Sequence, residues 1–177
     1  MPVNSKTKRL AELALLSAIA LIIFTVELNI PNPTPIAGIK LGLANIITVY
    51  GVYRYKAGEI ALVLFVRIVL GSLFSPNPSA ILYSLAGGTF CLLGMLLLKK
   101  IIPRNRLWLC SVLGAVLHNA GQILTAFLLM KTSAVFMYLP FLTVSGCIAG
   151  LFTGVCAQLL LTRLSKKRER KDNGEGS

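Results

Sequence analysis

The sequence has 177 residues, of which 55% are hydrophobic and only 14% are charged, and its mean hydropathy is +0.77. A soluble domain of this length needs more polar residues to cover its core, so the composition excludes a soluble fold and predicts one membrane domain. The formal net charge is +12, but the basic residues lie in short segments between apolar runs, which argues against a nucleic-acid partner.

Six apolar segments follow one another along the chain. The first, residues 10–28, comes directly after a short basic stretch and is expected to be a retained signal-anchor helix. The second, residues 36–53, has only a short purely apolar part, because it contains Lys40 and several glycines. The other four segments are long enough to cross a bilayer and cover residues 57–74, 80–98, 107–130 and 135–161.

The distribution of charge decides whether residues 36–53 cross the membrane. With six crossings and a cytoplasmic N-terminus, the cytoplasmic segments hold all but three of the 18 lysines and arginines, the exceptions being Lys40, Arg67 and Lys131. With five crossings, the two largest basic clusters would lie outside, against the positive-inside rule. The sequence therefore predicts an all-α integral membrane protein with about six transmembrane helices and both ends in the cytoplasm.

The chain divides into residues 1–165, expected to form a single transmembrane domain, and residues 166–177, expected to be a basic, disordered cytoplasmic tail that anchors at anionic lipid. The four cysteines lie inside apolar runs without the spacing of a metal or redox site, and there is a single histidine. Neither a metal nor a cofactor is expected.

Small residues recur at four-residue spacing in two of the segments, where they allow close approach of another helix. Gly146, Gly150 and Gly154 in the last segment are expected to pack within the monomer. Ala14 and Ala18 in the first segment fit either internal packing or contact with a partner. On the outer side, the proline-rich residues 29–35 form a stiff loop that either covers a site or only connects two helices.

Polar side chains inside the apolar segments are the functional candidates, because ionisable groups in hydrocarbon are costly and often mark a binding path. The candidates are Glu27, Lys40, Asn45, Arg67, His118, Asn119 and Gln122. In one pocket in the outer half of the bilayer they would suit a small anionic or zwitterionic molecule. The alternative is that Arg67 pairs with Glu27 and only stabilises the bundle.

The most distinctive stretch is residues 35–46, Pro-Ile-Ala-Gly-Ile-Lys-Leu-Gly-Leu-Ala-Asn-Ile. Together with Glu27 and residues 67–74, Arg-Ile-Val-Leu-Gly-Ser-Leu-Phe, it resembles the Gx transporter family, whose members often carry the name heptaprenyl diphosphate synthase component I. The resemblance covers nearly the whole chain. The family is similar to the substrate-binding S components of energy-coupling factor transporters.

The resemblance implies a six-helix bundle with a ligand pocket near the outer face, closed by the loop between the first two helices. It also implies that Ala14 and Ala18 dock a transmembrane coupling subunit that is driven by two ATPases. The resemblance and the basic flanks together imply a bacterial cytoplasmic membrane.

The family's name implies a synthase activity, and the sequence can be searched for the motifs that this activity requires. A chain-elongating prenyl diphosphate synthase needs aspartate-rich motifs that hold magnesium on the diphosphate. This sequence has a single aspartate, Asp172, and no Walker-type lysine loop, so we expect neither synthase nor ATPase activity.

Two hypotheses about the function remain. One is a substrate-binding subunit for uptake that is energised by partner subunits, and the other is a non-catalytic membrane accessory of isoprenoid or quinone synthesis that contacts an enzyme through residues 99–106.

Overall fold

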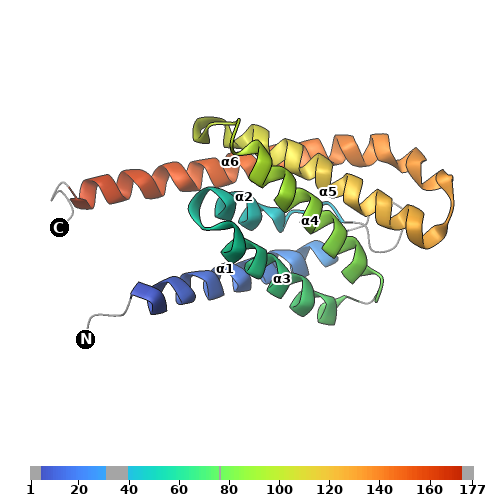
Figure 1. Ribbon diagram of the computed structural model, residues 1–177, viewed down its shortest axis with the longest axis horizontal. Helices are drawn as coiled ribbons and strands as arrows, with labels where there is room; N and C mark the ends of the chain where they lie inside the picture. Colours follow the sequence, from blue (N-terminus) through green and yellow to red (C-terminus); the bar gives the residue numbers. More distant parts are fainter. Residues whose placement is uncertain (1–4, 31–39, 76, 173–177) are drawn as a thin grey trace.

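The computed structural model describes residues 5–30, 40–75 and 77–172, with side chains as far as Lys166. It confirms the all-helical class, because 87% of it is helix and the described residues contain no strand. The elements, shown in Figure 1, are α1 (Ser5–Leu28), α2 (Asn45–Arg54), α3 (Ala57–Phe74), α4 (Ala80–Leu98), the 3₁₀ turn η1 (Arg104–Arg106), α5 (Leu107–Met130), the 3₁₀ turn η2 (Ser133–Tyr138) and α6 (Leu139–Asp172).

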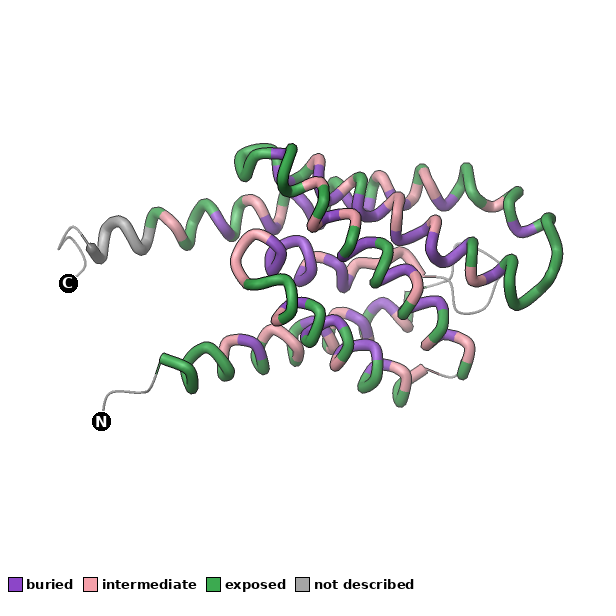
Figure 2. The backbone as a smooth tube through the Cα atoms, in the orientation of Figure 1, coloured by how far each residue is buried: buried purple, intermediate pink, exposed green. Residues whose placement is uncertain are grey.

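Five of the described helices, α1 and α3 to α6, are long and apolar enough to cross a membrane. The shortest, α3, has 18 residues and is about 27 Å long, close to the thickness of bilayer hydrocarbon. Large apolar side chains such as Ile22, Phe152 and Ile148 lie exposed on the outer helix faces, where a soluble protein would carry polar groups. The exposed positions follow these outer faces in Figure 2. The protein is therefore a multi-pass membrane protein.

The prediction of one membrane-length helix over residues 36–53 is wrong for the described part of that segment. Residues 40–44 are not helical, and α2 has only 10 residues, which makes it about 15 Å long and half a bilayer deep. Gly42 interrupts the helix with a φ of +80°, a conformation that glycine adopts without steric cost. Irregular backbone at this depth is tolerated where protein surrounds it.

The short helix α2 lies at the centre of the bundle and packs against all five long helices. Seven of its ten residues are buried, among them Val49 and Val52, which join the main apolar core with Ile60 and Met95. On one side of α2, α1 packs against α3, and on the other, α5 packs against both α4 and α6 (Figure 1). Residues that surround the first turn of α2 therefore come from several helices.

The start of α1 and the C-terminal end of α6 lie at the same end of the bundle, on the left of Figure 1. The start of α3 lies there too, because Arg9 of α1 forms a bidentate ion pair with Glu59 of α3. The chain therefore returns from the far end of α1 through residues that include α2.

The C-terminal end of α6 reaches Asp172. Most of the tail that was expected to be disordered, residues 166–177, is therefore helical. Lysine, arginine and glutamate, which make up much of it, are good helix formers.

The glycines of α6 face α5 at close range. A Cβ atom built on Gly150 would lie 2.8 Å from Cα of Val112, and one on Gly154 would lie 2.7 Å from Cα of Trp108. One on Gly146 would collide with the side chain of Asn119. These three glycines thus serve packing between α5 and α6 inside the monomer. Ala14 and Ala18 of α1, in contrast, are exposed.

Candidate binding site

A buried cavity lies where the end of α1, the starts of α2 and α4 and the middles of α3 and α5 meet. Its volume is about 10 Å³, which is on the scale of a single water molecule. It is lined by Phe24, Glu27, Lys40, Gly42, Ala44, Asn45, Arg67, Ser84, His118 and Gln122. Six of the seven candidate residues from the sequence are therefore brought together here.

The seventh candidate, Asn119, lies elsewhere. It follows His118 on α5, so its side chain leaves the helix in a different direction. Its Nδ2 donates to the main-chain oxygen of Leu142 on α6, and it is buried against the glycine face of that helix. In this structure Asn119 joins two helices and does not line the cavity.

The non-helical segment before α2 forms one wall of the cavity and is held by side chains of two helices. The carboxylate of Glu27 on α1 accepts a hydrogen bond from the main-chain nitrogen of Gly42. In the amide orientation that satisfies its neighbours, Gln122 on α5 accepts from the nitrogen of Lys40 at 3.2 Å and donates to its oxygen at 3.1 Å. Both backbone groups of Lys40 are thus satisfied, as buried backbone requires.

His118 lies one helical turn before Gln122 on the same face of α5. In the same orientation of Gln122, the amide oxygen also accepts from Nε2 of His118 at 3.2 Å. The imidazole packs against Gly87 of α4 on one side and against Gly42 on the other, where added Cβ atoms would lie 2.8 Å and 3.1 Å from the ring. Glycine at these two positions makes room for the ring.

Arg67 is buried in the middle of α3, and its Nη1 donates to Oδ1 of Asn45 at 3.4 Å. Among the described residues no ion pair within 4.0 Å joins Arg67 to Glu27. The alternative in which Arg67 simply pairs with Glu27 is therefore not what this geometry shows. Arg67 instead contributes a cation that is incompletely paired.

Lys40 points its ammonium into the bundle. The Nζ atom lies 3.7 Å from the centre of the Phe24 ring, a distance typical of a cation–π contact. This contact offsets part of the cost of burying the charge but uses none of the three N–H donors of the ammonium for a hydrogen bond.

Several donors at the cavity have no hydrogen-bond partner among the described residues: Lys40 Nζ, Asn45 Nδ2 and Arg67 Nε. Buried polar groups are almost always paired, so three unpaired donors in one place are unusual. The fixed charges are two cations and one carboxylate, which leaves one positive charge in excess. The positive end of the α2 dipole, at Asn45, adds to this potential. The arrangement attracts a group that has a negative charge and several acceptor atoms.

The family model for heptaprenyl diphosphate synthase component I matches residues 16–160, which is most of the chain. The chain belongs to this family. No curated protein and no solved structure matches the sequence. The match to the heptaprenyl diphosphate synthase component I family includes every residue that lines the cavity. A component, by its name, works with a partner subunit.

Some residues of the cavity were missed by sequence reasoning. Phe24 is an apolar residue of the first segment, and Ser84 is a small hydroxyl residue in a segment without a charge, so no local signal separates them from packing residues. Gly42 had a signal, since it stands between Lys40 and Asn45 in the distinctive stretch. The predicted covering loop falls largely on residues 31–39, which lie outside the described residues.

Proposed function

We propose that the protein is a substrate-binding subunit, similar to the S component of an energy-coupling factor transporter, for uptake of a small anionic or zwitterionic molecule. The observation that carries the proposal is the buried cavity with two cations and three unpaired donors. Such groups are costly in a membrane interior unless a ligand completes them. A bundle that needed only stability would use apolar residues here.

The small size of the cavity means that ligand binding requires a change in conformation. About 10 Å³ holds no more than a water molecule, so a larger ligand enters only when one wall moves. The wall formed by residues 40–44 is the natural candidate, because it is not helical and is held by side-chain hydrogen bonds from Glu27 and Gln122. Binding would then exchange these internal contacts for contacts with the ligand.

The membrane orientation follows from charge. The end of the bundle that holds the start of α1 also carries Arg9, Arg54 and Lys56, so we place it in the cytoplasm and the cavity in the outer half of the bilayer. The chain then crosses six times, with α2 and its preceding segment as one crossing. The membrane is the bacterial cytoplasmic membrane in this proposal.

The protein itself is proposed to have no catalytic activity and to need no cofactor. Energy would come from a transmembrane coupling subunit and ATPases. The exposed Ala14 and Ala18 of α1 give such a subunit a surface that allows close helix approach. Asp172, the single aspartate of the sequence, lies at the end of α6 and far along the chain from the cavity residues.

The second candidate function is favoured by the family name alone: a non-catalytic accessory of a heptaprenyl diphosphate synthase in isoprenoid or quinone synthesis. In that case the cavity polar groups would matter only for folding. The cytoplasmic connection between α4 and α5, residues 99–106, would contact the enzyme.

Native mass spectrometry of the protein purified gently from its own membrane separates the two functions. We expect a bound small molecule in the wild type that is absent from Arg67→Ala and present in the control Arg163→Ala, which removes an exposed cation of α6. Melting temperatures show whether each variant is folded. A folded wild type without small molecule, copurifying with a soluble prenyl synthase, would instead support the accessory role.

A further inference from the structure

A second pocket lies at the opposite end of the bundle from the candidate binding site. It has a volume of about 250 Å³ and is lined by Glu12, Leu15, Leu16, Tyr50, Arg54, Tyr55 and Leu164. Glu12 and Glu27 are both on α1, and the 15 residues between them correspond to about 22 Å along the helix. The two sites are therefore separate.

The apolar part of this pocket consists of Leu15 and Leu16 of α1 and Leu164 of α6. Leu15 is 62% exposed and Leu164 is 40% exposed, so the apolar wall opens to the outside of the bundle. Because α1 and α6 make no substantial contact with each other, the pocket forms a groove between them over the end of α2. An apolar groove that opens toward lipid accepts a hydrocarbon chain.

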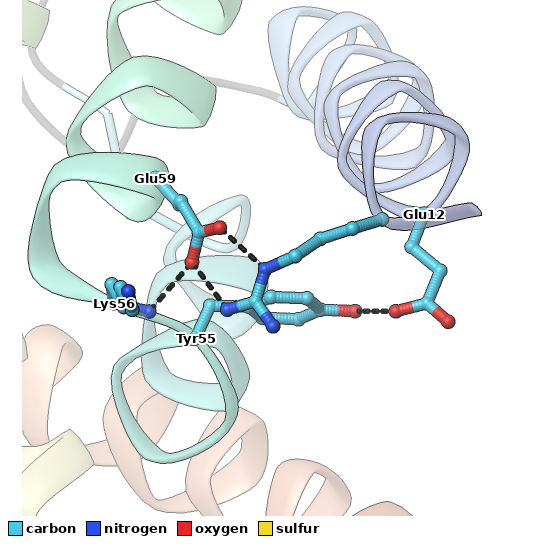
Figure 3. Close-up of polar contacts among 5 residues, drawn as sticks. Glu12, Tyr55, Lys56 and Glu59 are labelled. Carbon is cyan, nitrogen blue, oxygen red and sulfur yellow. Dashed lines mark hydrogen bonds and ion pairs between the residues drawn. The ribbon is translucent and has the colours of Figure 1, made fainter. Parts of the chain in front are cut away.

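The polar part of the pocket contains one cation and one anion. Tyr55, in the turn between α2 and α3, donates its hydroxyl to Oε2 of Glu12 at 3.0 Å, as Figure 3 shows. The guanidinium carbon of Arg54 lies 5.8 Å from the centre of the Tyr55 ring. Burial, and then the hydrogen bond to Glu12, raises the pKa of Tyr55 to about 12, so the phenol is a neutral donor at physiological pH.

Arg54 and Glu12 line the same pocket but do not pair with each other. Among the described residues the side chain of Arg54 has no hydrogen bond or ion pair, and its contact is the ring of Tyr55. The nearby Arg9 is occupied, since Glu59 binds its guanidinium at two points, and Glu59 also accepts from the nitrogen of Lys56 (Figure 3). Arg54, the cation that lines this pocket, is thus available for a phosphate.

We propose that this pocket binds a phospholipid whose headgroup carries both a phosphate and a primary ammonium, as in phosphatidylethanolamine. The phosphate contacts Arg54, the ammonium contacts Glu12, and an acyl chain lies along Leu15, Leu16 and Leu164. Arginine binds phosphate through a planar fork of donors, and a primary ammonium donates hydrogen bonds to a carboxylate.

The charges of the pocket distinguish this lipid from its relatives. An anionic headgroup without an ammonium, such as glycerol, carries the same phosphate but leaves the negative charge of Glu12 without a cationic partner. A quaternary ammonium has no N–H and cannot donate to Glu12. The depth of the pocket in the membrane also fits a phospholipid. Charged residues at this end, Arg9, Lys56 and Glu59, belong at the level of the lipid headgroups, whereas the leucines of the pocket reach into the hydrocarbon.

The test is native mass spectrometry of the detergent-purified full chain, titrated with dioleoyl lipids that carry ethanolamine, choline or glycerol headgroups. We expect the wild type to bind the ethanolamine lipid about tenfold more tightly than the other two. Arg54→Gln should weaken binding of all three lipids. Glu12→Gln keeps an acceptor for Tyr55 and should remove the preference for ethanolamine over choline.

Two further variants separate pocket binding from general lipid contact. Leu164→Trp fills the groove from an exposed position and should abolish the preference while the melting temperature stays unchanged. Arg163→Gln removes a neighbouring exposed cation of α6 outside the pocket and should leave lipid binding as in the wild type. The proposal is overturned if the three lipids bind equally, if the glycerol lipid binds best, or if folded Arg54→Gln and Leu164→Trp keep the preference.

Discussion

Glu27, near the end of α1, accepts a hydrogen bond from the main-chain nitrogen of Gly42, fifteen residues later in the sequence. The contact holds the irregular segment that leads into α2 against α1, and with it Lys40 and Asn45, which line the cavity. The carboxylate of Glu27 thus serves as a hydrogen-bond acceptor for a main-chain N–H group of the protein itself. The cavity depends on the conformation of this segment as much as on its charged side chains.

Gly42→Ala is expected to destabilise the protein and to empty the site. The residue has a φ of +80°, which costs a non-glycine residue about 1 to 2 kcal/mol. Its Cβ would also lie 2.8 Å from Nδ2 of Asn45 and 3.1 Å from the His118 ring. Thermal unfolding in detergent and the ligand content by mass spectrometry check both effects.

The matched control for this change is Gly58→Ala. Gly58 lies in the first turn of α3, where an added Cβ meets nothing within 4 Å. Alanine favours a helix over glycine by up to about 1 kcal/mol, so this variant should melt at the same temperature or slightly higher. Equal melting temperatures and equal ligand content for Gly42→Ala and Gly58→Ala would contradict the role given to Gly42.

Glu27→Gln tests the charge that the ligand carries. Glutamine keeps an oxygen that accepts from Gly42, so the fold should be retained, while the cavity gains a second excess positive charge. Because the unpaired groups are donors, we expect an anionic ligand to remain bound. Ligand content after purification gives the answer. Loss of ligand from a folded Glu27→Gln protein would show that the ligand carries a cationic group, and that it is zwitterionic.

Gly150→Val is expected to destabilise the packing of α5 against α6. The added Cβ would lie 2.8 Å from Cα of Val112 and 3.1 Å from the main-chain oxygen of Ser111, and backbone atoms move only if the whole helix moves. Such overpacking typically costs about 1 to 3 kcal/mol. The control is Ile148→Val on the exposed face of the same helix. A melting temperature for Gly150→Val no lower than that of the control would contradict the close approach.

The sequence predicted the membrane class and the five long helices because an apolar stretch of about 20 residues is a local signal that needs no knowledge of neighbours. It also selected Glu27, Lys40, Asn45, Arg67 and their partners on α5, because ionisable and amide groups stand out in hydrocarbon. It did not show that residues 40–44 leave the helix, since that conformation depends on Glu27 and Gln122 from distant parts of the chain. Asn119 was misplaced for a related reason: only the neighbouring helix reveals that it faces α6.

The orientation of the bundle in the membrane is tested by single cysteines placed in a cysteine-free background. Asn77, between α3 and α4, and Asn105, between α4 and α5, lie at opposite ends of α4 and outside the long helices. With six crossings and both ends in the cytoplasm, a membrane-impermeant thiol reagent should label Asn77→Cys in intact cells and Asn105→Cys only after the membrane is opened. The reverse pattern would place the basic connection between α4 and α5 outside. It would then also move the polar cavity to the cytoplasmic half of the bilayer, where uptake from outside could not begin.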